Sequence, residues 1–290
     1  MLYWTIIFGI FAVALYHLAY LQLPSLFGDQ FRSSLRQNTP KDQSTMAAAL
    51  PALKYLTVPA ASKHTATVIF VHGLGDTGHG WRPVADMFKV DPGLAHVKWV
   101  LPHSANMGMV MPSWYIPLAD NDVHAKFDIY SFGLDTEEDE EGMRQSANMI
   151  NELIRKEISD GIEPDRIVLG GFSQGGTMSL LTGLTGGHKL AGLVVLSGWL
   201  PLRNKFKELA SPHAAPSSIF WGTGTADPLV KLELATRSSD FLTMELGIPK
   251  AKPGETQGLS YNVYPGMIHT TIPEELDAVK TFIKKVIPIS

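Results

Sequence analysis

The chain has 290 residues, of which 45% are hydrophobic and 18% are charged, and its formal net charge is −4 at pH 7. This composition is typical of a globular protein, and the absence of a basic surplus argues against a nucleic-acid partner. The chain has no cysteine, which excludes disulfides, thiolate catalysis and cysteine metal sites.

Residues 1–27 form an apolar segment, in which residues 2–23 contain no charged side chain. Such a run is long enough to cross a bilayer as a helix, and the basic residues after it would place the main domain on the cytosolic side. The segment is therefore either a membrane anchor or a mispredicted start, because Met46 and the three alanines after it make a plausible alternative beginning. Residues 28–50 are polar and predict a flexible linker.

Residues 51–290 alternate between strand and helix signals, which predicts one domain. Short apolar, β-branched runs are typical of strands that are buried on both faces. Such runs occupy residues 67–71, 97–101, 167–169, 193–197, 218–221 and 259–264. Helical periodicity or capping signals predict helices at residues 81–88, at 138–159 and after a capping signal at 271–274. The last helix follows a capping-box pattern, Thr271 with Glu274. This alternation predicts an α/β fold with a mostly parallel central sheet and helices on both faces.

A Gly-x-Ser-x-Gly pentapeptide, residues 171–175, lies between a predicted strand and a predicted helix. In a nucleophile elbow, a tight turn of this kind exposes the serine hydroxyl at the end of a strand. Ser173 is then the nucleophile, and glycines beside it avoid clashes with the neighbouring backbone. The alternative for the pentapeptide alone is an ordinary glycine-rich turn.

The partners of Ser173 follow from chain order, which in α/β-hydrolases is serine, acid, histidine. Of the histidines after Ser173, only His269 follows a strand and immediately precedes a helix. Asp227 comes directly after the strand at 219–221 and would orient His269, although an aspartate before Pro228 also suits a simple turn.

Acyl transfer also needs two backbone N–H donors for the oxyanion. The residue after the nucleophile, Gln174, supplies one of them. The loop after the first strand, at residues 72–75, indicates Leu74 as the other, and His72 is expected to order this loop rather than to act as a base.

Five separated blocks of the chain resemble the acyl-protein thioesterases, in a fungal-type form with an N-terminal extension. These blocks are residues 72–81, 112–114, 169–176, 227–230 and 266–269. The resemblance implies an α/β-hydrolase fold, a Ser173, Asp227 and His269 triad, and oxyanion donors at Leu74 and Gln174. It also implies hydrolysis of palmitoyl thioesters on protein cysteines without a cofactor, with G-protein α subunits and Ras-type proteins as substrates, in the cytoplasm and nucleus.

The chain departs from the family pattern at three places that matter. Residues 197–202 are Ser-Gly-Trp-Leu-Pro-Leu, where a Ser-Cys-Trp-Leu-Pro-Leu block is common in the family. Residues 223–225 are Thr-Gly-Thr where the family usually has His-Gly-Asp, so the support around Asp227 differs. Residues 1–45 have no counterpart in the usual family pattern. If this extension spans a membrane through residues 2–23, the enzyme would be tethered with its domain facing the cytosol.

An apolar segment between the second strand and the long helix contains Met107, Met109, Met111 and Trp114. Methionines repack easily around flexible aliphatic groups, so these residues are predicted to bind the acyl chain. The alternative is a loop that only covers the core.

Three functions stay open from the residues alone. The first is a thioesterase, and the second is a carboxylesterase or lysophospholipase that uses the same triad on oxygen esters. The third is a binding module that has lost activity, against which the intact triad argues. The sequence contains no metal-site pattern and no phosphate-binding loop.

Overall fold

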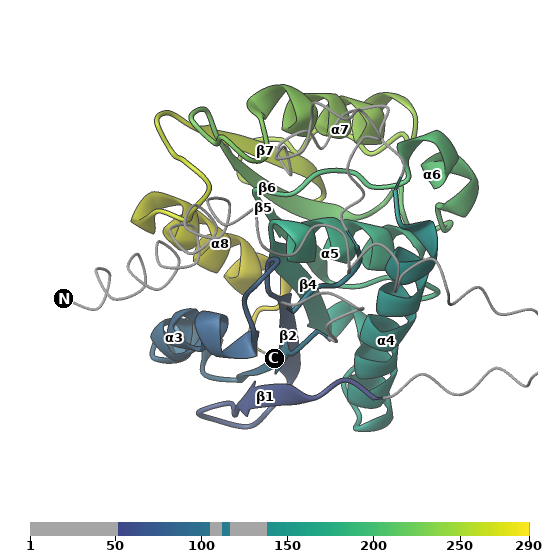
Figure 1. Cartoon of the computed structure of the whole chain (residues 1–290). Helices are drawn as coiled ribbons and strands as arrows, with labels where there is room; N and C mark the ends of the chain where they lie inside the picture. The colour runs from purple at the N-terminus through teal and green to yellow at the C-terminus, as the bar shows by residue number, and fades with distance from the viewer. Residues whose placement is uncertain (1–51, 105–111, 117–137, 290) are drawn as a thin grey trace, which may run out of the picture.

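The computed structural model describes residues 52–104, 112–116 and 138–289 (Figure 1). The predictions for the apolar segment, the linker and the three methionines Met107, Met109 and Met111 fall outside these residues. Within the described ranges, no helix is both long and apolar enough to cross a membrane.

A seven-stranded sheet with the order β1-β3-β2-β4-β5-β6-β7 forms the centre of the domain. Its strands are β1 (Tyr55–Val58), β2 (Ala66–Val71), β3 (Val97–Pro102), β4 (Ile167–Phe172), β5 (Gly192–Leu196), β6 (Ser218–Gly224) and β7 (Gly258–Tyr264). Strand β1 pairs with β3 in antiparallel fashion, and every other pairing is parallel. The predicted mostly parallel sheet is therefore confirmed, with one short edge strand, β1, that the sequence pattern did not indicate.

Helices cover both faces of the sheet, as predicted (Figure 1). Helices α4 (Glu140–Ser159), α5 (Gln174–Thr185), α6 (Arg203–Leu209) and α7 (Leu232–Met244) contribute to one hydrophobic cluster. Helices α3 (Gly78–Lys89) and α8 (Pro273–Val286) contribute to the other. Two short 3-10 turns, Pro92–Leu94 and Pro164–Arg166, lead into strands β3 and β4. Strands β2, β4 and β5 are buried along their whole length because helices lie on both sides of them.

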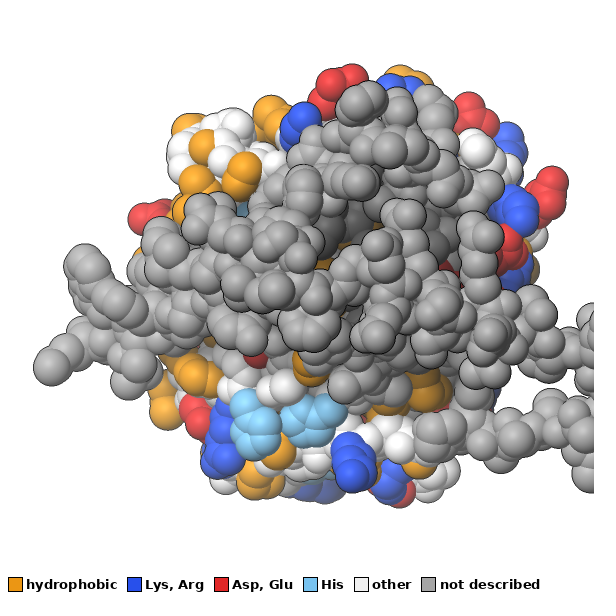
Figure 2. Space-filling view, in the orientation of Figure 1, with side chains coloured by type: hydrophobic (Ala, Val, Ile, Leu, Met, Phe, Trp, Pro, Cys, Tyr) orange, Lys and Arg blue, Asp and Glu red, His pale blue; other side chains and the backbone are white. Residues whose placement is uncertain are grey.

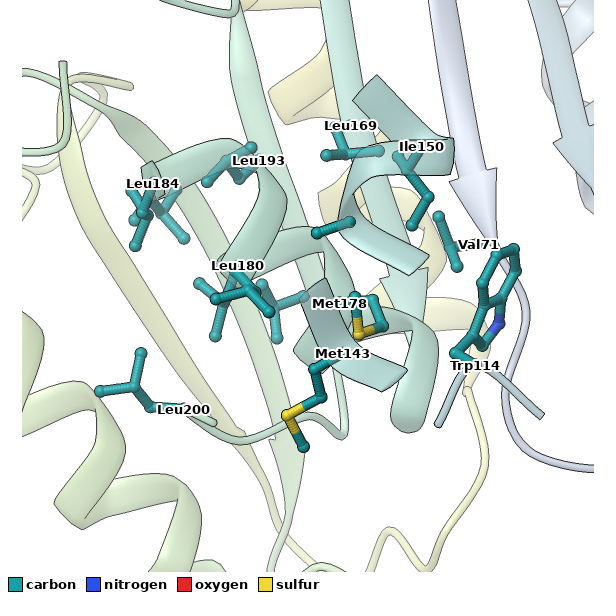
Figure 3. Packing of buried hydrophobic residues seen from close by; sticks show 14 of the residues in the cluster. Val71, Trp114, Met143, Ile150, Leu169, Met178, Leu180, Leu184, Leu193 and Leu200 are labelled. Atoms are coloured by element: carbon teal, nitrogen blue, oxygen red, sulfur yellow. The ribbon is translucent and has the colours of Figure 1, made fainter. Parts of the chain in front are cut away.

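The larger cluster lies around α5, directly behind the end of β4 (Figure 3). Met178 of α5 and Met143 of α4 belong to this cluster, and Val71 and Trp114 lie on the side of strand β2. This packing fixes α5, and with it the turn between β4 and α5, against the sheet.

The capping box predicted at the start of α8 is wrong. The helix begins at Pro273, and its N-cap is Ile272, whose side chain makes no capping hydrogen bond. Proline suits the first helical position because its φ is already helical and it lacks the N–H that would be unpaired there. Thr271 therefore lies one residue too early to cap, and its buried hydroxyl has no partner among the described residues.

Acidic and basic side chains are interspersed over the described part of the surface in Figure 2. Several form exposed ion pairs, such as Arg144 with Glu140 and Lys156 with Asp160. The described part of this face presents mixed charge, in keeping with the small net charge of the chain.

Candidate active site

Ser173 occupies the single position between the last residue of β4 and the first residue of α5. Its φ of 53° and ψ of −122° are values that a residue with a side chain rarely adopts. The turn is held by the Ser173 N–H, which donates to the Leu196 carbonyl at 2.8 Å, and by the Thr177 N–H, which donates to the Ser173 carbonyl at 3.0 Å. A strained residue fixed in this way is typical of a functional site.

The glycines on both sides of Ser173 are required by close backbone packing. A Cβ atom on Gly175 would lie 2.1 Å from the Val71 carbonyl oxygen and 2.5 Å from that of His72. A Cβ atom on Gly171 would lie 2.4 Å from the carbonyl of Gly175. The start of α5 therefore packs directly on the end of β2, which brings the elbow against the loop that follows β2.

The structure brings Ser173, His269 and Asp227 into one hydrogen-bonded chain. The His269 Nε2 atom lies 2.9 Å from the Ser173 hydroxyl, and its Nδ1 atom lies 2.8 Å from Oδ2 of Asp227. Because a carboxylate can only accept, the Nδ1 atom carries the proton and Nε2 is left to accept from the serine. This is the tautomer in which histidine can take a proton from the nucleophile.

Asp227 is held by backbone donors. Its Oδ1 atom accepts from the N–H groups of Leu229 and Val230, at 2.8 and 2.9 Å, and its side chain is buried. These bonds hold the carboxylate in place and leave Oδ2 for His269.

The loops that carry the acid and the histidine pack backbone to backbone. The Ala226 N–H donates to the Met267 carbonyl at 3.1 Å, and a Cβ atom on Gly224 would lie 2.0 Å from that carbonyl oxygen. The Thr225 hydroxyl accepts from the Gly266 N–H at 2.8 Å. The Thr-Gly-Thr sequence at 223–225 therefore supports the two loops through backbone contacts and one threonine hydroxyl.

The loop after β2 lies beside the nucleophile. A Cβ atom on Gly73 would lie 3.4 Å from the Cβ of Ser173, so the loop and the elbow are in van der Waals contact. Among the described residues, no hydrogen bond occupies the N–H of Leu74 or that of Gln174. Within the described part of the chain, both N–H groups are thus available for the oxyanion role predicted from the sequence.

His72 is buried with both ring nitrogens engaged. The Ser104 N–H donates to Nε2 at 3.1 Å, so Nδ1 carries the proton and donates to the Gly73 carbonyl at 2.7 Å. Burial lowers the pKa of His72 to about 4, which keeps the ring neutral. A ring engaged in this way orders the loop and has no free nitrogen to act as a base.

Trp114 lies in the core instead of on an accessible wall. It is fully buried, and its indole N–H donates to the His72 carbonyl at 2.9 Å. No part of the side chain is exposed in this structure, and the contact of Trp114 with the acyl chain stays a prediction. Hydrophobicity alone could not separate a core tryptophan from one that lines a pocket.

Two further buried polar side chains, one at the site and one in helix α8, were not singled out from the sequence. The Gln174 amide is buried against the 112–116 segment, where its oxygen accepts from the Trp114 N–H at 2.9 Å. Glu275 is buried in the first turn of α8 against Gly222, close behind His269 in the chain. A sequence signal existed for Glu275, since it lies four residues before Val279 on the apolar stripe of α8.

Comparison with known proteins agrees with this geometry. A family model described as Phospholipase/Carboxylesterase matches residues 54–287. The acyl-protein thioesterase 1 of Cryptococcus neoformans is 44% identical over 243 residues, which cover 80% of this chain and 96% of that protein. The acyl-protein thioesterase 1 of Gibberella zeae is 43% identical over 250 residues, 80% of this chain and 95% of that protein. The crystal structure of Zea mays acyl-protein thioesterase 2 superposes with a TM-score of 0.64 at 25% identity, covering 81% of this chain and 99% of that one.

Proposed function

Because this chain belongs to the phospholipase/carboxylesterase family of serine hydrolases, we propose that it is an acyl-protein thioesterase. The reaction is the hydrolysis of palmitoyl thioesters on protein cysteines. The observation that carries the proposal is the continuous hydrogen-bonded chain from Ser173 through His269 to Asp227, in a domain whose relatives bear that activity in their names.

In the first half of the reaction, Ser173 Oγ attacks the thioester carbonyl while its proton passes to His269 Nε2. The negative charge that develops on the carbonyl oxygen accepts hydrogen bonds from the N–H groups of Leu74 and Gln174. Asp227 stabilises the imidazolium that forms. The intermediate then collapses, the C–S bond breaks, and the cysteine sulfur leaves with the proton from His269.

In the second half, His269 takes a proton from water, which attacks the acyl-serine ester. The second tetrahedral intermediate uses the same two N–H groups. Its collapse returns the proton to Ser173 Oγ and releases the fatty acid. No step in this sequence needs a metal or a cofactor, and the described residues contain no cluster of three metal-binding side chains.

We further propose palmitoylated G-protein α subunits and Ras-type proteins as substrates, in the cytoplasm and nucleus. This extension rests on the resemblance of the chain to the acyl-protein thioesterases. If the apolar residues 2–23 form an anchor, the same domain would work at the cytosolic face of a membrane, where such acylated proteins lie.

The second candidate is a carboxylesterase or lysophospholipase, which the description of the matching family favours. Thioester and oxygen-ester attack pass through the same tetrahedral geometry, so the triad serves both. The two reactions differ in the leaving group. A thiol has a pKa of about 8.5, so a thiolate departs more readily than an alkoxide.

Paired peptides separate the two candidates. The same peptide is palmitoylated on cysteine or, in a second synthesis, on serine, and kcat/KM is measured for each. We expect at least about tenfold preference for the thioester, equivalent to about 1.4 kcal/mol in transition-state stabilisation. Equal turnover would favour the general esterase. Failure to turn over either peptide, together with no labelling of Ser173 by a fluorophosphonate, would exclude both enzymes.

A further inference from the structure

We propose that Trp114 is a positioning residue for the oxyanion site, and that it sets the place of the Leu74 N–H relative to that of Gln174. The proposal rests on acyl transfer at Ser173 as the function. Trp114 does not touch the reacting atoms, since it is fully buried behind the loop after β2. It acts through two short hydrogen-bonded connections, one to each donor.

The first connection runs from the indole ring to the residues on either side of Leu74. The Trp114 N–H at Nε1 donates to the His72 carbonyl at 2.9 Å. On the far side of Leu74, the Gly75 N–H donates to the Pro112 carbonyl at 2.9 Å. The 112–116 segment therefore holds the loop at two points, and the donor peptide lies between them.

The orientation of the donor peptide is fixed as well. The Leu74 N–H belongs to the same peptide group as the Gly73 carbonyl, and in a trans peptide the two point in opposite directions. The His72 ring donates from Nδ1 to that carbonyl at 2.7 Å. Trp114 fixes the backbone of His72, and the His72 ring fixes the Gly73 carbonyl. Since this carbonyl shares a peptide group with the Leu74 N–H, the direction of the N–H is fixed as well.

The second connection joins the 112–116 segment to the other donor residue. The side chain of Gln174 accepts from the Trp114 backbone N–H at 2.9 Å and donates to the Tyr115 carbonyl at 3.1 Å. The backbone N–H of the same Gln174 is the donor that follows the nucleophile. One glutamine therefore places its N–H at the oxyanion site and anchors the segment that positions the opposite donor.

The segment has a firm base on helix α4. The Ser146 hydroxyl donates to the Trp114 carbonyl, and the Asp139 carboxylate accepts from the Ile116 N–H at 2.9 Å. Every polar backbone atom of Trp114 is thus paired with a buried side chain. A segment fixed to both α4 and α5 can act as a spacer between the two oxyanion donors.

The spacing of the donors matters in the transition state more than in the ground state. The donors must lie about 2.7–3.1 Å from the oxyanion, which is displaced from the position of the substrate carbonyl oxygen. A small shift of Leu74 therefore weakens transition-state binding and leaves substrate binding almost unchanged. Loss of one such donor lowers kcat by about 10²–10³, so a displaced donor should have a smaller effect.

The test compares two tryptophan variants of the full chain. Trp114→Phe removes the indole N–H that holds His72. Trp99→Phe is the matched control, because Trp99 is equally buried but its N–H has no hydrogen-bond partner among the described residues. Both variants lose the same atoms from a core. We expect Trp114→Phe to lower kcat about tenfold with KM within twofold, and Trp99→Phe to keep kcat within twofold.

A second readout addresses the oxyanion site directly. The affinity for an acyl trifluoromethyl ketone, which forms a tetrahedral adduct with Ser173, should fall in parallel with kcat in Trp114→Phe and stay constant in Trp99→Phe. Should Trp114→Phe fail to fold, Gln174→Met replaces it. This variant keeps the backbone donor but loses the side-chain amide that holds Trp114. We expect kcat and the affinity for the ketone to fall as in Trp114→Phe.

Equal kcat and equal ketone affinity in the wild type and the folded variant would overturn the proposal. So would a fall in kcat that Trp99→Phe shares, since that result would trace the effect to lost core packing. An inactive wild type would instead remove the proposed function, whereas an active wild type with an unaffected variant removes only the role of Trp114.

Discussion

Replacing Ser173 by alanine is expected to lower kcat for a palmitoyl thioester by about 10⁶-fold, because the covalent route through the acyl-enzyme closes when the nucleophile is lost. His269 and Asp227 then have no hydroxyl to activate, and only the oxyanion donors and substrate binding can still accelerate hydrolysis. The measurement is single-turnover hydrolysis of a palmitoylated peptide, with fluorophosphonate labelling as a second assay. Labelling should disappear completely.

Ser179→Ala is the matched control for this variant. Ser179 lies on the same helix, α5, and its buried hydroxyl donates to the Gly175 carbonyl at 2.8 Å. It lies outside the hydrogen-bonded chain from Ser173 to Asp227, so kcat and labelling should match the wild type. A Ser173→Ala protein that retains more than about a thousandth of the wild-type kcat would mean that another group is the nucleophile.

Replacing Glu275 by glutamine is expected to stabilise the protein increasingly as the pH rises from 5 to 8. Glu275 is fully buried, and neither carboxyl oxygen has a hydrogen-bond partner among the described residues. Burial raises the pKa of this carboxyl to about 8, from an ordinary value of 4.5. The folded state therefore keeps a proton in this pH range that the unfolded state has lost.

The sign of the effect follows from this difference in bound protons. Where the folded state binds more protons than the unfolded state, the free energy of unfolding falls as the pH rises. The fall is about 1.4 kcal/mol per pH unit and amounts to something on the order of 4 kcal/mol by pH 8. Glutamine has nearly the same shape and no titrating proton, so the free energy of unfolding of the variant does not fall with pH on account of this residue.

Urea denaturation of both proteins at pH 5, 6, 7 and 8 measures the difference. The free energies of unfolding should be similar at pH 5 and diverge in favour of Glu275→Gln toward pH 8. The control is Glu274→Gln, which removes an exposed carboxylate from the same helical turn and should leave the wild-type profile in place. A constant difference between Glu275→Gln and wild type at all four pH values would contradict the prediction.

The residues of the proposed triad could be picked out from the sequence because each lies in the loop after a strand. Parallel strands bring their carboxyl ends to one edge of the sheet, so loops that are distant in the chain meet there. The elbow, the acid loop and the histidine loop follow β4, β6 and β7, and the structure places Ser173, Asp227 and His269 within hydrogen-bonding distance. Chain order and strand positions were sufficient for this part of the site.

The features that the sequence did not reveal depend on contacts across the fold. Strand β1 has only four residues, three of them not fully buried, so it lacks an apolar run. A tryptophan can line a pocket or fill the core, and its hydrophobicity is the same in both. Trp114 is in the core because its indole N–H donates to the His72 carbonyl and its ring packs in the cluster that includes α4. The position of Glu275 on the apolar stripe of α8 can be read from the sequence, but its packing against the backbone of Gly222 cannot.

The order of strands at one edge of the sheet has a consequence for synthesis on the ribosome. After β4, each new strand joins the one made just before it, so β5, β6 and β7 each find a partner edge already formed. Ser173 and His269 are 96 residues apart in the chain. At about 5–20 residues per second, roughly 5–20 s pass between the synthesis of the nucleophile and that of its base. Throughout that interval the emerging chain carries Ser173 without the histidine that would activate it.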